Sequence, residues 1–129
     1  MFSNQGRNQV AFYSETGDKY LASIPNLSAP SGLAVTDDTL YVAETNRHCV
    51  RSFRITRART PNGAWADSVE IEARTIFQGF NIPIDVAVCR DDAHTVYVSN
   101  LGDNTVKELT SKATVWEVHR KWRCISSQR

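Results

Sequence analysis

The side chains that most often do chemistry in proteins are widely spaced in this 129-residue sequence. The three histidines are His48 in a polar turn, His94 in an acidic turn and His119 near the C-terminus. A zinc site or a catalytic centre needs side chains that converge on one point. We expect these histidines to lie on separate outer surfaces, and we therefore predict no catalytic residue and no metal ligand.

The cysteines and the short motifs point to the same conclusion. Cys49, Cys89 and Cys124 are odd in number and irregularly spaced, which fits neither a disulfide framework nor a zinc site. We expect them to be reduced thiols in an intracellular protein. The sequence has no Gly-x-Ser-x-Gly motif, no phosphate-binding glycine loop and no Cys-x-x-Cys pair. We accordingly predict no cofactor.

Two aspartate pairs, at 37–38 and 91–92, resemble a duplicated carboxylate site. Each pair occupies a tight turn between two strand-like segments. Aspartate is favoured in such turns because its side chain accepts a hydrogen bond from the backbone two residues further on. Turn chemistry therefore explains both pairs without any acid–base role.

These turns belong to a pattern that occurs twice. Residues 30–53 read PSGLAVTDDTLYVAETNRHCVRSF, and residues 83–109 read PIDVAVCRDDAHTVYVSNLGDNTVKEL. The order of proline, apolar run, acidic turn, Tyr-Val, polar turn and valine is matched throughout. The offset is 53 residues at the proline and 56 from the tyrosine onward. Repetition at such a spacing is the mark of a repeat architecture.

Each copy predicts a small antiparallel sheet. An apolar run, 32–35 or 84–88, predicts a first strand buried on both faces. A Tyr-Val strand follows the acidic turn, and an alternating third strand follows the polar turn. After a loop at 57–67, the alternation over 68–77 predicts an outer fourth strand. Residues 8–13 and 19–24 predict the third and fourth strands of a preceding sheet.

The first copy resembles the NHL repeat, the blade unit of one class of β-propeller. The second copy departs from it, with Asp85 for a glycine, Asn100 for an acidic residue and Leu109 for a phenylalanine. The resemblance implies an all-β fold of consecutive four-stranded antiparallel blades, related to the six-bladed gluconolactonase-like and strictosidine-synthase-like propellers. The residues that carry it are Pro30, Gly32, Ala34, Val35, Leu40, Tyr41, Val42, Ala43, Glu44, Asn46, Val50 and Phe53.

The chain holds little more than two such blades, so we expect an incomplete ring. We place a half blade at 1–27 and full blades at 28–80 and 81–118, the last strand being 114–118. The basic residues 119–129 form a tail that fits no blade position. Because an open arc exposes strand edges and apolar flanks, we expect a fragment of a longer protein or a chain that self-associates.

The resemblance to gluconolactonase-like propellers also implies where a metal site would lie. In that group, some ligands for a divalent metal come from the residue just after the repeat's proline. Here Ser31 and Ile84 stand at those positions, and neither is a good ligand for a hard cation. Asp85 is expected on the other strand face. Ser31 and Asp85 are our candidates at the channel mouth, and a metal-dependent lactonase- or lyase-like enzyme with ligands in other blades is the alternative function.

The function we favour, as the NHL resemblance implies, is a scaffold or binding surface for a partner protein. The net charge is −3 before Lys107 and +4 from Lys107 onward. We therefore expect no nucleic-acid binding except through the basic tail. The expected contact residues come from the charged loop and the polar turns, with the tryptophan as an exposed aromatic contact: Arg47, His48, Arg57, Arg59, Trp65, Asp103 and Asn104.

The composition fits a globular chain, since 41% of the residues are hydrophobic and the net charge is +1. No apolar run reaches the roughly 18 residues that a membrane helix requires. The first ten residues, MFSNQGRNQV, lack the basic and then apolar form of a signal peptide. We expect a cytoplasmic protein with no membrane partner.

Overall fold

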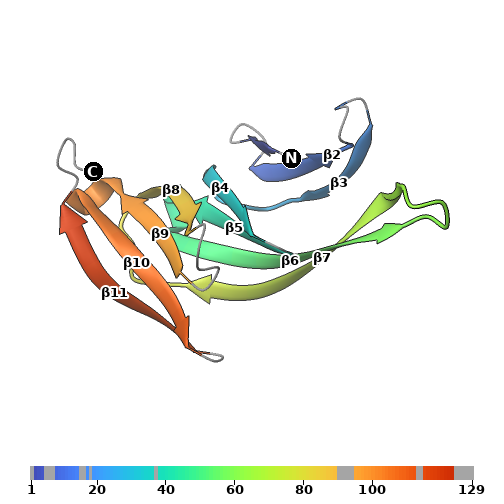
Figure 1. The fold of residues 1–129 in the computed structure, drawn as a ribbon. Helices are drawn as coiled ribbons and strands as arrows, with labels where there is room; N and C mark the ends of the chain where they lie inside the picture. The colour runs from blue at the N-terminus through green and yellow to red at the C-terminus, as the bar shows by residue number, and fades with distance from the viewer. Residues whose placement is uncertain are drawn as a thin grey trace.

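A computed structural model describes residues 2–4, 8–14, 17, 19–36, 38–89, 95–112 and 115–123. The described chain is all-β, as expected, and its strands form three antiparallel sheets that follow one another in an open arc (Figure 1). Within these ranges no helix is long and apolar enough to cross a membrane. Sheet A contains β1 (Phe2–Asn4), β2 (Gln9–Tyr13) and β3 (Tyr20–Ile24); sheet B contains β4 (Pro30–Thr36), β5 (Thr39–Glu44), β6 (Cys49–Arg59) and β7 (Trp65–Phe77); sheet C contains β8 (Pro83–Val88), β9 (Thr95–Asn100), β10 (Thr105–Lys112) and β11 (Val115–Arg123).

Sheets B and C pair their strands in the same register, which confirms the repeat at the level of hydrogen bonding. Ala43 of β5 lies opposite Gly32 of β4 and Val50 of β6. In sheet C the corresponding row is Asp85, Ser99 and Val106. Each sheet also has an irregularity after its first proline, between Pro30 and Gly32 and between Pro83 and Asp85.

The backbone torsions repeat as well. A left-handed residue precedes each first strand, although neither residue is a glycine: Ala29 has φ of 53° and Ile82 has φ of 51°. Such a conformation is costly for alanine and more so for a β-branched residue, so the surrounding contacts must hold it. A second left-handed residue precedes β2, β6 and β10, where it turns the chain into the strand. These residues are Asn8, His48 and Asn104.

Sheet A has three strands in the described chain, and β2 and β3 are the predicted third and fourth strands. β1 pairs with β2 and contacts β4, just as β5 of sheet B pairs with β6 and contacts β8. β1 therefore takes the second position of its sheet. The described residues of sheet A provide no strand at the innermost position that β4 and β8 take in the other sheets.

The hairpin of β6 and β7 is longer than the sequence indicated. The expected loop at 57–67 is shortened to a turn at 60–64, closed by hydrogen bonds from Thr60 N–H to the Ala64 carbonyl (2.7 Å) and from Gly63 N–H to the Thr60 carbonyl (2.9 Å). Arg59 pairs with Trp65 in the ladder. Charged residues on an exposed outer hairpin hide its strand character from a pattern that looks for apolar alternation.

The last strand also differs from the expectation, because β11 runs to Arg123 and pairs with β10 from Thr105 to Lys112. Residues 119–123, which the sequence pattern assigns to a basic tail, thus belong to sheet C. Residues 124–129 lie outside the described chain.

Two apolar cores lie between the three sheets and hold them together. Val10 and Phe12 of sheet A pack with Leu40, Val42 and Phe53 of sheet B in the first core. The second core lies between sheets B and C; its buried members are Tyr41, Ala43, Val50, Phe77, Phe80, Val86, Val96, Val98 and Leu109. Each fully buried Val or Leu side chain contributes about 1.5–3 kcal/mol to folding. Sheet B therefore anchors the arc, because it is covered on both faces.

Candidate binding surface

The turn after β5 is built around a buried carboxylate. Glu44 is fully buried, and its Oε1 accepts a hydrogen bond from the Ser28 N–H at 2.9 Å. Arg47 Nη1 lies 3.2 Å from Oε1, and Arg51 Nε lies 3.5 Å from Oε2. A buried charge is tolerated when such partners compensate it. Arg47, which we predicted as a contact residue, is thus half exposed and tied to the frame of sheet B.

His48 joins sheet B to sheet C. Its Nδ1 accepts a hydrogen bond from the backbone N–H of Ile82 at 3.0 Å, in the linker that leads to β8. Asn8 plays the same part between sheets A and B, where its Oδ1 accepts from Ala29 N–H at 3.2 Å. Asn104 holds the equivalent position in sheet C and is exposed. The predicted contact residue His48 therefore has a structural role at this junction.

The channel-mouth candidates lie where β4 approaches β8. Ser31 Oγ is 2.7 Å from Thr45 Oγ1, which in turn donates to the Pro83 carbonyl at 2.8 Å. Asp85 is exposed, and its Oδ1 accepts from Val86 N–H at 2.9 Å. Ile84 offers no donor atom. Asp85 is thus the single carboxylate among these three residues, and the described chain contains no group of three His, Cys, Asp or Glu side chains placed to hold a metal ion.

The remaining predicted contact residues lie apart from these turns. Arg59 Nη1 donates to the Gly63 carbonyl at 2.7 Å, inside the hairpin turn. Trp65 begins β7, and its side chain is outside the described part of the structure. Asp103 Oδ1 accepts from the Thr105 hydroxyl at 2.5 Å at the start of β10. Arg57 lines a cavity.

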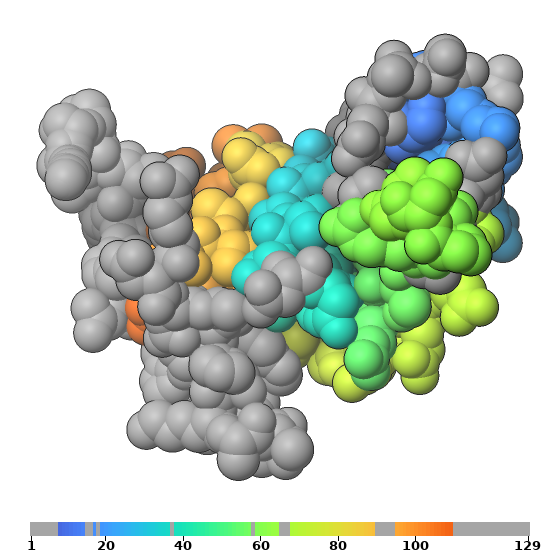
Figure 2. Space-filling view, turned by 45° about the vertical axis from the view of Figure 1, so that its right-hand side comes forward, coloured from blue at the N-terminus to red at the C-terminus, as the bar shows by residue number. Residues whose placement is uncertain are grey.

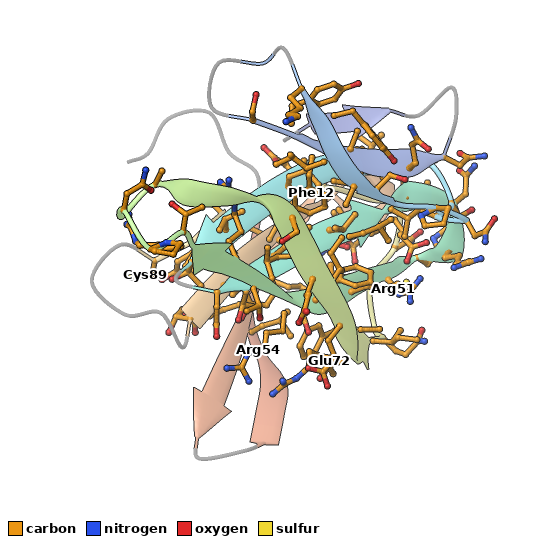
Figure 3. All side chains as sticks on the ribbon, turned by 90° about the vertical axis from the view of Figure 1, so that its right-hand side faces the viewer. Phe12, Arg51, Arg54, Glu72 and Cys89 are labelled. Carbon is orange, nitrogen blue, oxygen red and sulfur yellow. The ribbon has the colours of Figure 1, made fainter. Side chains whose placement is uncertain are left out.

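That cavity is a groove of about 480 Å³ between sheets A and B. The hairpin of β6 and β7, green in Figure 2, lies beside the blue strands of sheet A on this side of the molecule. The labelled Phe12 of β2 points from sheet A toward the strands of sheet B (Figure 3). The groove is lined by Phe12, Tyr13, Leu21, Val35, Asp38, Arg54, Ile55, Thr56, Arg57 and Val69.

A smaller and more polar hollow of about 240 Å³ shares Asp38 and Arg54 with this groove. Arg54 Nε lies 3.2 Å from Asp38 Oδ2, and both side chains are about half exposed. Arg54 stands opposite Glu72 of β7, at the rim of sheet B in Figure 3. The groove thus has apolar walls and a charged rim.

Two groups in sheet B have raised pKa values. Burial, reinforced by the neighbouring Glu44 carboxylate, raises the pKa of the Cys49 thiol to about 11. Burial, with Asp38 as a smaller cause, also raises the pKa of Tyr41. Both groups stay protonated near neutral pH. Cys49 therefore lacks the thiolate that a nucleophile or a metal ligand requires.

A family model, that of the NHL repeat, matches residues 27–53, the stretch from the linker before β4 into β6. The chain contains an NHL repeat. The match covers the first of the two copies and confirms the resemblance seen there. Glu44, one of the residues that carry the resemblance, lies within the match; what the sequence did not reveal is its burial, because a charged residue suggests a surface position.

A solved structure of a functionally unknown protein from Desulfotomaculum acetoxidans is similar to this chain, with a TM-score of 0.65 and 17% sequence identity. The likeness covers 89% of this chain and 35% of that one, so the chain spans about a third of its length. At this identity the likeness shows the fold alone. No curated protein matches the sequence.

Proposed function

We propose that this NHL-repeat chain is a binding module that holds a segment of a partner protein in the groove between sheets A and B. The observation that carries the proposal is the groove itself, with apolar walls from two sheets and arginines at its rim. Protein interfaces commonly combine an apolar centre with a polar rim in which arginine is enriched. The bound segment would place apolar side chains against Val35 and Ile55 and an acidic side chain near Arg57.

A matched pair of variants tests this proposal. Val35 is 47% exposed in the groove, and Ile76 is 55% exposed elsewhere on sheet B. Peptides selected from a random display library on the folded chain should combine apolar residues with Asp or Glu. In fluorescence anisotropy, Val35→Asp should weaken the selected peptides by at least about tenfold, since truncating a central contact costs more than about 1.4 kcal/mol. Ile76→Asp should change the affinity less than about twofold.

Equal effects of the two substitutions would place the peptide outside the groove and contradict the proposal. Circular dichroism of both variants shows whether the fold is retained, and the exposure of both side chains makes that the expected result. Titration of the peptides with an Arg57→Gln variant gives a second reading, because acidic peptides should lose affinity and their amide counterparts should not.

A further inference from the structure

The turn after β9 and the start of β8 form a rim of sheet C. The corresponding rims of sheets A and B each bind the linker to the next sheet. In sheet B this rim holds the linker that leads into sheet C, through Thr45 to the Pro83 carbonyl and through His48 to the Ile82 N–H. In sheet A, Asn8 holds the linker that leads into sheet B. The rim of an NHL-type sheet is therefore a place where an extended backbone segment is bound.

The residues of this rim in sheet C differ from those of sheet B. Thr45 and Ser31, which hydrogen-bond to each other in sheet B, correspond to Leu101 and Ile84 in sheet C. Leu101 is 57% exposed and Ile84 is 38% exposed. The segment Leu101–Asp103 (η2) lies next to β8, so the two exposed apolar residues belong to neighbouring elements.

The third difference is Asp85, which stands in the register position of Gly32. A Cβ on Gly32 would lie 2.6 Å from Asp85 Cα, so only a glycine lets β8 approach β4 as closely as it does. Asp85 has a Cβ and a carboxylate at that position. Because of these atoms, a further strand cannot come as close to β8 as β8 comes to β4. Sheet C is therefore shaped for a different neighbour.

The polar groups of this rim are held in place by local contacts. The N–H groups of Leu101 and Gly102 donate to the carbonyls of Ile82 and Asn81 at 2.9 and 3.0 Å. Asp103 is fixed by the Thr105 hydroxyl at 2.5 Å. Preorganised groups lose little conformational entropy when a ligand binds. We define the C rim as Ile84, Asp85, Leu101, Asp103 and Asn104.

We propose that the C rim binds an extended basic segment of a partner protein, at a surface separate from the groove. An apolar side chain of the segment covers Leu101 and Ile84, and lysine or arginine side chains lie next to Asp85 and Asp103. Asn104 accepts a backbone N–H of the segment, as His48 and Asn8 do in sheets B and A. The two aspartates provide the charge complementarity that selects a basic partner over an acidic one.

The test uses synthetic heptapeptides with one leucine flanked by lysines, and matched peptides in which glutamate replaces lysine. Binding to the isotopically labelled full chain is followed by amide chemical shifts. We expect the lysine peptide to shift Leu101, Gly102 and Asn104, and the glutamate peptide to shift none of them. Leu101→Ser and the double variant Asp85→Gly with Asp103→Asn should each weaken binding by at least fivefold. Val35→Ser, a change at an exposed side chain of the groove, should leave it unchanged.

The proposal is overturned by equal binding of both peptides, by unchanged binding of the lysine peptide to the rim variants, or by loss of binding on Val35→Ser. Loss of groove binding with intact rim binding would refute only the function proposed above. If Asp85→Gly alone makes the chain associate with itself while the lysine peptide fails to bind the wild type, the rim is a site for another sheet and not for a basic segment. Thermal melts of each variant establish that the fold is retained.

Discussion

At the scale of single residues, equivalent positions in the two repeats accept a hydrogen bond from the preceding linker with different side chains. Glu44 and Asn100 are both fully buried at the ends of β5 and β9. Asn100 Oδ1 accepts from Asn81 N–H at 3.0 Å, as Glu44 accepts from Ser28 N–H. The Asn100 amide Nδ2 has no hydrogen-bond partner in the described chain. The carboxylate is thus well compensated, whereas the amide is only half satisfied.

This comparison predicts unequal costs for the same truncation. Glu44→Ala removes the partner of Arg51, whose side chain is 21% exposed, and should lower the free energy of unfolding by about 3 kcal/mol. Asn100→Ala removes one hydrogen bond and one unsatisfied donor, and should cost about 1 kcal/mol. Urea unfolding of the two variants measures both values. Costs that agree within error would show that the ion pairs of Glu44 contribute nothing to stability.

At the scale of strands and sheets, the close approach of β4 and β8 depends on a single glycine. A Cβ at position 32 would meet Asp85 Cα at 2.6 Å and the Ile84 carbonyl oxygen at 2.9 Å, and neither backbone atom can turn aside. Gly63 offers a control, because it has φ of 90° and nothing lies within 4 Å of a Cβ placed there. A substitution at Gly32 therefore tests steric crowding between two sheets, and the same substitution at Gly63 tests backbone strain within one turn.

We therefore predict that Gly32→Ala destabilises the chain more than Gly63→Ala does. Forcing β8 away from β4 should cost about 3 kcal/mol, at the upper end for an overpacked contact. Gly63→Ala should cost about 1 kcal/mol, the usual penalty of a left-handed conformation for a residue with a Cβ. Chemical denaturation of both variants gives the comparison. A larger cost at Gly63 would mean that the two strands separate easily.

The strands could be predicted from the sequence because their alternation is local, and the repeat fixed which segments correspond. The groove could not. Phe12 and Leu21 come from sheet A and Ile55 and Val69 from sheet B, and each has the alternating pattern of an ordinary core residue. Leu21, Ile55 and Val69 stay half-buried where the two sheets meet, whereas Phe12 is buried. The roles of Arg47 and His48 were equally hidden, since an exposed turn residue that pairs with a buried carboxylate or holds a neighbouring linker is of the same type as a residue that binds a partner.

At the scale of the whole molecule, the arc leaves strand edges without a neighbouring strand in the described chain. β1 has a strand on one side, at β2, and no strand of the described residues lies at the innermost position of sheet A. β7 is an outer strand of 13 residues, but exposed Glu70, Glu72 and Arg74 on it oppose pairing with another copy. The inner edges carry fewer charges, so association between copies should use them.

We predict that the chain associates with itself in a concentration-dependent way through these inner edges. Size-exclusion chromatography with light scattering over a concentration series should show a mass that rises above that of one chain. Because paired strands gain backbone hydrogen bonds and bury apolar flanks, high salt should not dissolve the assembly, whereas it would weaken one held by surface charges. A single chain mass at every concentration would mean that the arc protects its own edges. In that case the C rim and the groove would be the surfaces on which partners act, and each of the two peptide titrations tests one of them.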